Sequence, residues 1–366
     1  MAKKNKSTNF WLLMIVFTLL IYGLISLYSA SAVESFKKFN TNTYYIIHQV
    51  LYGGIIGIFT MFILSKIDYH FWQKYLGILV LVSLALLAAV KIPGLGIEAG
   101  GASRWLNLGF SLQPSELAKV VIVFYVAAWV SKKNQTLNDF SLGLLPSLII
   151  IGLYAGLILW QPDFGTMLVL ISTAMLMLFA GGINWRYLFW TLVAGFLGLF
   201  ALIHFEPYRA KRITAFLNPQ TDPQGISYHI QQALIGIGAG GLWGYGYGLS
   251  RQKHNYLPEV MGDSIFAVLA EEQGFFRVLI VLALFALLAL KGFQIAKRAP
   301  DLFGKMTAFG LTSWITLQAL INIAAIIKLI PLTGIPLPFF SYGSTALIVN
   351  LGSIGILMNI SKQSQS

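Results

Sequence analysis

The chain alternates between long apolar runs and short polar segments. A helix needs about 20 mostly apolar residues to cross a bilayer, and ten runs reach or approach that length. Because these runs are much longer than buried strands, they predict an all-α integral membrane protein with about ten transmembrane helices. The predicted spans are residues 10–32, 44–66, 74–92, 114–131, 143–160, 164–181, 186–204, 264–290, 306–327 and 341–360.

One long polar segment, residues 205–263, separates the seventh run from the eighth. Such a segment is costly to keep unless it has a function. Long loops are poor guides to orientation, and once this one is set aside Lys and Arg are more frequent on the side of the N-terminus. We therefore expect both termini in the cytoplasm, this loop outside the cell, and residues 1–366 in a single polytopic membrane domain whose outer loop carries part of the active site.

The composition supports a membrane location. Hydrophobic residues make up 57% of the chain, charged residues 10%, and mean hydropathy is +0.74, whereas soluble domains carry about 25% charged residues. The absence of cysteine excludes disulfides and thiolate chemistry. The net charge of +12 suits anionic lipid headgroups or a phosphate-bearing ligand. The cations are spread over many loops, so nucleic acid is not expected as a partner.

Two charged residues lie inside the fourth apolar run. Glu116 and Lys119 are three residues apart, which places them on one helix face where they can pair. Charge within a membrane segment is costly and therefore often functional. A structural ion pair and a charged pair that faces a polar cavity both remain open.

Acidic residues also mark the start of the eighth run. Asp263 lies where the outer loop becomes a helix, so it is either a helix N-cap or a carboxylate held at the membrane edge. Glu271 and Glu272 follow about two turns later and must point in different directions. One of them could pair loosely with Arg277 while the other faces a cavity.

Basic and glycine-rich stretches characterise the outer loop. Arg209 and Arg212, with Lys253, could clamp a pyrophosphate or attract anionic headgroups. The glycines from Gly236 to Gly248 lack the Lys-Ser/Thr ending of a nucleotide loop, so they predict close helix packing or a re-entrant turn. No metal-ligand spacing and no hydrolase triad can be read from the sequence.

Several motifs in fixed order resemble those of the SEDS family (shape, elongation, division and sporulation). The match is closest to the cell-division FtsW branch, with the RodA-like elongation branch second. The matching stretches are Ser103–Leu106, Gln113–Lys119, Gln161–Gly165, Arg209–Pro219, Tyr228–Leu234, Leu257–Glu259, Asp263, Ala270–Gly274 and Ile335–Gly343.

The resemblance implies a peptidoglycan glycosyltransferase that polymerises lipid II at the outer face of the cytoplasmic membrane. It also implies a class B penicillin-binding protein and divisome proteins as partners, membrane lipids as surroundings, and a location at the division septum. The family's catalytic positions map onto Asp263, Glu116 and Lys119. Substrate contacts are expected at Arg104, Arg209, Arg212, His229, Gln232, Lys253, Glu272 and Ser341.

These expectations define a mechanism and its competitors. Asp263 would accept the proton of an attacking sugar hydroxyl, and Lys119, Arg209 and Arg212 would stabilise the pyrophosphate that leaves. A divalent cation, Mg²⁺ or Mn²⁺, could assist, with ligands that the sequence does not identify. The alternative activity is a lipid II flippase, which intramembrane charges would serve equally well. A scaffold that only recruits a partner is the third reading.

Overall fold

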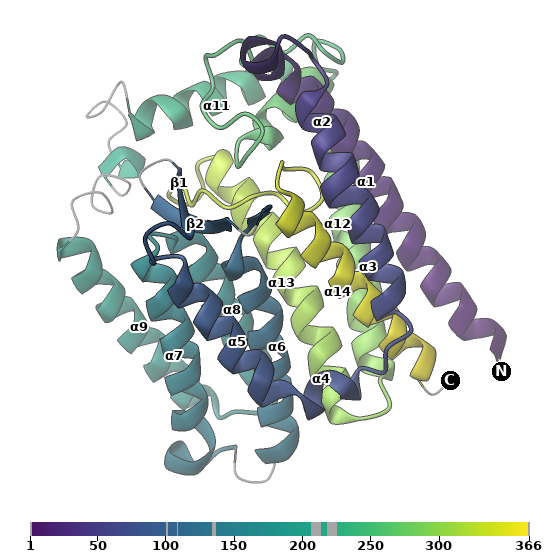
Figure 1. Ribbon diagram of the computed structural model, residues 1–366, viewed down its shortest axis with the longest axis vertical. Coiled ribbons are helices and arrows are strands. Elements are labelled where there is room, and N and C mark those ends of the chain that lie inside the picture. The colour runs from purple at the N-terminus through teal and green to yellow at the C-terminus, as the bar shows by residue number, and fades with distance from the viewer. Residues whose placement is uncertain are drawn as a thin grey trace.

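Long helices lie side by side in a bundle, and a smaller cap covers one end of it (Figure 1). The computed structural model describes residues 2–99, 102–107, 109–133, 137–205, 214–217 and 225–364. The α-helices are α1 (Ala2–Phe39), α2 (Tyr44–His48), α3 (Ile56–Leu64), α4 (His70–Lys74), α5 (Leu76–Ala89), α6 (Pro114–Lys133), α7 (Leu145–Trp160), α8 (Phe164–Ala180), α9 (Trp185–Phe205), α11 (Ile226–Gly240), α12 (Ile265–Arg298), α13 (Leu302–Ile326) and α14 (Ser344–Gln363). Two π-helical turns, Gln49–Ile55 and Phe140–Leu144, precede α3 and α7.

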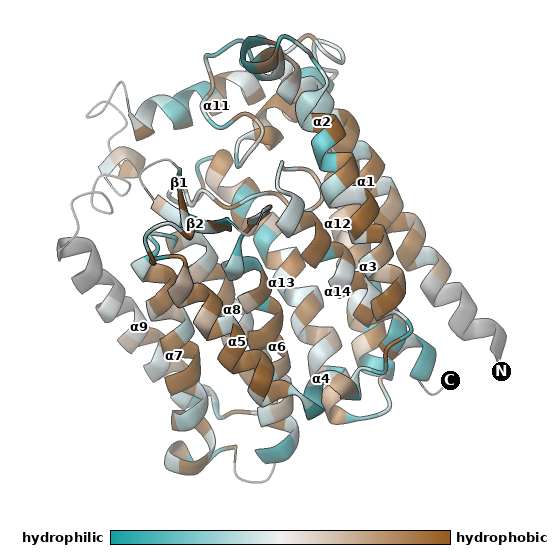
Figure 2. Cartoon of the chain, in the orientation of Figure 1, coloured by the Kyte–Doolittle hydropathy of each residue, from teal (hydrophilic) through white to brown (hydrophobic). Residues whose placement is uncertain are grey.

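A helix overlaps each of the ten predicted apolar runs. Within the described residues, seven helical stretches are long and apolar enough to cross a membrane, and α5 and α8 are shorter apolar helices. Apolar residues cover the bundle, while polar residues concentrate at its ends (Figure 2). A multi-pass helical membrane protein is therefore confirmed, and the number of spans stays a prediction.

The all-α prediction is wrong between α5 and α6. Three short strands, β1 (Gly96–Ala99), β2 (Ala102–Asn107) and β3 (Ser111–Leu112), form an antiparallel sheet in the order β1-β2-β3. A bulge between Ile97 and Glu98 interrupts the first pairing. Strands of two to six residues leave too few alternating positions for a pattern to emerge from the sequence.

Helices α6, α13 and α14 form the most buried part of the bundle. Trp314 on α13 is fully buried, and α13 packs along α6, α8 and α12. Close approach of α14 to α3 requires a small residue, because a Cβ on Gly355 would lie 2.3 Å from the carbonyl oxygen of Met61. This tightly packed centre supports the cap at one end of the bundle.

The glycine-rich stretch forms the junction between α11 and α12. A Cβ on Gly240 would lie 2.1 Å from the carbonyl oxygen of Ala270, and Gly244 has φ +78°, a backbone conformation that favours glycine. The chain from 241 to 246 hydrogen-bonds to the backbone of α12, which is interrupted at Gly274 (φ 74°, ψ 178°). The prediction that these glycines permit close packing is confirmed.

Candidate functional site

Asp263 lies in a tight turn that leads directly into α12. The N-cap of α12 is Ser264, and this helix has no side-chain cap hydrogen bond, so the N-cap interpretation of Asp263 is wrong. The carbonyl oxygen of Glu259 accepts hydrogen bonds from the amides of Gly262 (2.9 Å) and Ser264 (3.3 Å). The Asp263 side chain is 8% exposed, and Ser264 Oγ donates to its Oδ1 at 3.3 Å.

His229 on α11 joins this carboxylate. Its Nε2 lies 3.9 Å from Asp263 Oδ1 and is hydrogen-bonded to Ser264 Oγ. In a hydrolase triad the histidine lies between the serine and the aspartate. Here the serine hydroxyl contacts both the histidine and the aspartate, so the order of the three groups differs from that of a triad. The structure thus brings together two predicted site residues that are 34 positions apart in the sequence.

The backbone of the turn is fixed from the bundle side. Asn322 Nδ2 on α13 donates to the carbonyl oxygens of Asp263 and Ile335, both at 2.8 Å. Ser341 Oγ donates to the carbonyl oxygen of Gly262 at 2.6 Å and accepts from the amide of Leu337 at 2.8 Å. Ser341, predicted as a substrate contact, therefore holds the residue next to Asp263.

Glu116 and Lys119 form a buried ion pair on α6. The distance from Lys119 Nζ to Glu116 Oε1 is 2.8 Å, and the two residues are 2% and 0% exposed, respectively. Lys119 Nζ also donates to Gln318 Oε1 at 2.7 Å and lies 4.9 Å from the centre of the Trp314 ring. The pair therefore exists as predicted, but it is enclosed by α13.

Gln318 extends this cluster toward the outer end. Its Oε1 also accepts from Trp314 Nε1 at 2.9 Å, and its Nε2 donates to the carbonyl oxygen of Pro336 at 3.0 Å. Pro336 follows Ile335, which Asn322 holds. Gln318 and Asn322 thus bind two consecutive carbonyl groups of the proline-rich loop, residues 327–343, which connects α13 to α14.

A second set of buried acids ties the outer loop to α12. Glu272 Oε1 accepts from Lys253 Nζ at 3.0 Å and from Ser29 Oγ at 2.6 Å. Glu271 accepts from the amides of Arg251 (3.0 Å) and Gln252 (3.3 Å). The loose pairing of one glutamate with Arg277 is wrong, because the Arg277 guanidinium donates instead to backbone carbonyl groups, those of Trp243 at 2.9 Å and Gln273 at 3.4 Å.

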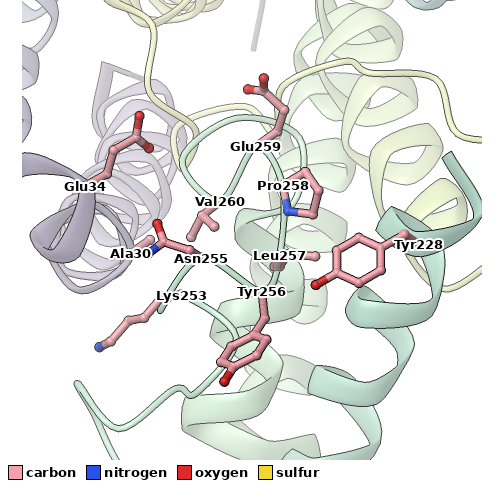
Figure 3. A pocket seen from close by; sticks show the side chains of 10 residues that line it. All are labelled: Ala30, Glu34, Tyr228, Lys253, Asn255, Tyr256, Leu257, Pro258, Glu259 and Val260. Atoms are coloured by element: carbon pink, nitrogen blue, oxygen red, sulfur yellow. The ribbon is translucent and has the colours of Figure 1, made fainter. Parts of the chain in front are cut away.

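A cavity of about 270 Å³ opens between α1, the first turn of α11 and the outer loop (Figure 3). Its polar lining includes Glu34, Asn255 and Glu259, with the rings of Tyr228 and Tyr256. Glu259 has φ +49°, a strained conformation for a residue with a side chain. Partial burial and then the nearby Asp263 charge raise the pKa of Glu259. The cavity therefore carries acidic groups close to the Asp263 turn.

The remaining predicted contacts are dispersed. Arg104 on β2 donates to the carbonyl oxygens of Gln161 (3.3 Å) and Pro162 (2.6 Å). Gln232 is half-buried on α11. Arg209 and Arg212 lie outside the described residues. Within the described part of the chain, no three His, Cys, Asp or Glu side chains gather as a metal site.

Sequence reasoning missed Gln318 and Asn322. Both lie four residues apart within an apolar run, which places them on one helix face. Polar side chains at such positions in a membrane helix are themselves a signal of function. That signal was available, but charge drew the prediction to Glu116 and Lys119 instead.

The fold and the site together define a class of protein: a multi-pass helical membrane protein with a buried carboxylate site beneath a polar cap at one end. The chain belongs to the FtsW/RodA/SpoVE family of cell cycle proteins, whose model matches residues 10–366. This confirms the SEDS resemblance that the motifs carry.

Relatives and solved structures agree over nearly the whole chain. It is 40% identical to stage V sporulation protein E of Bacillus subtilis over the full length of both. It is 39% identical to a probable peptidoglycan glycosyltransferase FtsW of Geobacter sp. (strain M18), over 95% of each chain. The structure matches a chain of a peptidoglycan synthase complex with a TM-score of 0.79, at 27% identity over 96% of each chain. It also matches the rod shape determining protein RodA of Thermus thermophilus with a TM-score of 0.69, at 26% identity over 97% of each chain.

Proposed function

We propose that the protein is a peptidoglycan glycosyltransferase that polymerises lipid II into glycan strands. Family membership and the names of the FtsW relatives, at 36–39% identity, support this activity. The proposed topology has ten spans, cytoplasmic termini, and an outer loop at 205–263 between the seventh and eighth. A substrate whose lipid tail stays in the bilayer suits a site at the membrane edge.

The Asp263 turn carries the mechanistic proposal. The turn is fixed through its backbone by Asn322 and Ser341, while the carboxylate is not used to cap α12. A sugar hydroxyl is a weak nucleophile, and a positioned carboxylate that accepts its proton accelerates the attack. In this mechanism the 4-hydroxyl of one N-acetylglucosamine attacks C1 of the N-acetylmuramic acid of the growing chain, and undecaprenyl pyrophosphate leaves.

The leaving pyrophosphate needs cations in the transition state. Lys253 is engaged by Glu272, and Lys119 is engaged by Glu116 and Gln318, so neither ammonium group has its full charge to offer. The proposed pyrophosphate ligands are therefore Arg209 and Arg212. Glu116 and Lys119 are assigned a supporting role.

The proposed setting is a wall-synthesis complex. The structural match to a chain of a peptidoglycan synthase complex supports a partner that crosslinks the glycan, of the class B penicillin-binding type. Relatives named for sporulation and for FtsW favour division-type synthesis at a septum, with divisome proteins nearby.

The decisive experiment uses purified protein and lipid II in detergent, where no two sides exist for transport. Wild-type protein forms glycan polymer, and Asp263→Asn lowers the rate at least about 100-fold, as expected for loss of a general base. Glu98→Gln, which removes an exposed acid on β1, is the matched control and keeps the wild-type rate. Melting curves establish that both variants fold.

Two outcomes would overturn the proposal. Full activity of Asp263→Asn would remove the assigned base. No polymer from wild-type protein, together with transfer of lipid II across the bilayer of reconstituted vesicles, would establish the flippase instead.

A further inference from the structure

A line of hydrogen bonds runs from the first two turns of α6 to the Asp263 turn. It begins at Glu116, passes through Lys119 to Gln318, and continues through the carbonyl groups of Pro336 and Ile335 to Asn322. Asn322 then donates to the carbonyl oxygen of Asp263 at 2.8 Å. The four residues that contribute side chains to this line are each at most 2% exposed.

The two amides at its centre lie one turn apart on α13. The spacing of four residues stacks Gln318 and Asn322 on the same helix face. Each contacts two different segments: Gln318 joins α6 to the proline-rich loop, and Asn322 joins that loop to the first residues before α12. These two side chains therefore fix the relative positions of three segments that are distant in the sequence.

The Glu116–Lys119 pair is not explained by stability. Removing two charges from water costs more than their attraction returns unless their remaining polar atoms are satisfied. Within the described residues, Glu116 Oε2 has no hydrogen-bond partner, nor does Asn322 Oδ1. Buried polar groups left partly unsatisfied call for a role beyond packing. Such a role is available at the other end of the hydrogen-bonded line.

We propose that Gln318 and Asn322 are positioning residues, through which the Glu116–Lys119 pair holds the Asp263 turn in its reactive place. The inference rests on the proposed function of Asp263 as the base. Catalytic groups must be held within about 0.5 Å of their productive position. The Asn322 amide meets this need because it anchors the Asp263 backbone while leaving the carboxylate to face His229 and Ser264.

The first test removes the donor and keeps the shape. Asn322→Leu keeps the number and branching of the side-chain heavy atoms and suits a membrane helix, but it cannot donate to the two carbonyl groups. A displaced turn lowers kcat about 10- to 100-fold, while KM for lipid II changes less than about twofold. Ser313→Ala is the matched control, because Ser313 is buried on the same helix and its hydroxyl has no hydrogen-bond partner in the described chain. This control keeps the wild-type kcat.

The second test asks whether the ion pair acts through the amides. Replacing both charges in Glu116→Met/Lys119→Met leaves no stranded ion, so folding is retained. This double variant and Gln318→Met each lower kcat. If both act through one line, combining them costs little more than the more severe change alone. Losses that multiply would show that the pair acts independently of Gln318 and would overturn the proposal.

The third test does not depend on catalysis. Backbone amide exchange of residues 259–264 is measured for wild type, Asn322→Leu and the double-methionine variant. Both variants speed exchange in this turn, whereas Ser313→Ala leaves it unchanged. If amide exchange is unchanged in both variants, the proposed positioning role is wrong, even when the wild-type protein is active. Inactive wild-type protein with faster exchange in the variants would instead refute the function and leave the structural line intact.

Discussion

The protein contains two buried glutamate–lysine pairs, Glu116–Lys119 and Glu272–Lys253, and their residues come together in different ways. Glu116 and Lys119 lie three residues apart in the first two turns of a single helix, α6. Glu272 and Lys253 join α12 to the outer loop across 19 residues. Helix geometry alone brings the first pair together, whereas the second pair holds a loop against α12.

Their partners show what each pair supports. Around Glu272 the partners are a serine of α1 and groups of the loop itself, so this pair fixes the cap onto the bundle. Around Lys119 the partner is Gln318, which leads toward Asp263. The same kind of ion pair therefore closes a loop at Glu272–Lys253 and positions the Asp263 turn at Glu116–Lys119. The neighbouring polar groups account for this difference.

The largest effect is expected from a substitution that breaks the loop-closing pair, Glu272 and Lys253. Glu272→Gln keeps the shape of the side chain but leaves the Lys253 charge buried without its counter-ion. Removing one partner of a buried pair costs about 3–5 kcal/mol, so the melting temperature falls steeply. Because the loop loses its anchor, limited proteolysis should cut between residues 241 and 258.

A matched double variant sharpens this result. Glu272→Met with Lys253→Met removes both charges, and most of the lost stability returns. Glu116→Gln serves as the comparison: it destabilises the protein similarly but leaves the 241–258 segment resistant to protease. Equal cleavage of that segment in both single variants would contradict the division of roles.

The helices were predictable because each apolar run carries its own length signal. The pairing of Glu116 with Lys119 was predictable for the same reason, since helix geometry fixes neighbours three residues apart. The partner of Glu272 was not, because a loop of irregular backbone brings Lys253 to it over 19 residues. Local spacing offered only Arg277, which the turn at Gly274 directs to backbone carbonyl groups instead.

The site was predictable in its residues but not in its construction. Family motifs placed Asp263 at the helix start, and the competing N-cap reading failed because Ser264 occupies that position. The clamp by Asn322 depends on three segments meeting in space, which no single stretch encodes. The small sheet was not predicted because its strands are too short to show an alternation of apolar and polar residues.

A smaller effect on stability is expected from Glu259, an acid in the loop next to the Asp263 site. The pKa of Glu259 is raised by partial burial and by the charge of Asp263. A carboxyl group with a raised folded-state pKa favours the folded state at low pH, and this contribution is lost as pH rises through that pKa. Glu259→Gln stays neutral, so its melting temperature should exceed that of wild type increasingly as the pH rises above about 4.

Two further measurements make this result specific to Glu259. Asp263→Asn removes the repelling charge, so it should lower the pKa of Glu259, which a titration followed by NMR of labelled glutamate would show. Glu98→Gln replaces an exposed acid on β1 and should leave the pH dependence of stability as in wild type. A constant offset between Glu259→Gln and wild type at all pH values would mean that packing, and not charge, dominates at this position.

The smallest expected effect belongs to a third pair, Glu34 and Lys38 on α1. Its atoms are closer than those of either buried pair, at 2.6 Å, and its spacing of four residues is a favourable one for a helix. Both side chains are exposed, at 36% and 55%, so water already solvates the charges when the pair is broken. Lys38→Ala should therefore change the free energy of unfolding by less than about 1 kcal/mol, and less again in high salt. A shift as large as that of Glu272→Gln would show that contact distance, rather than burial and the partners beyond the pair, sets the importance of an ion pair in this protein.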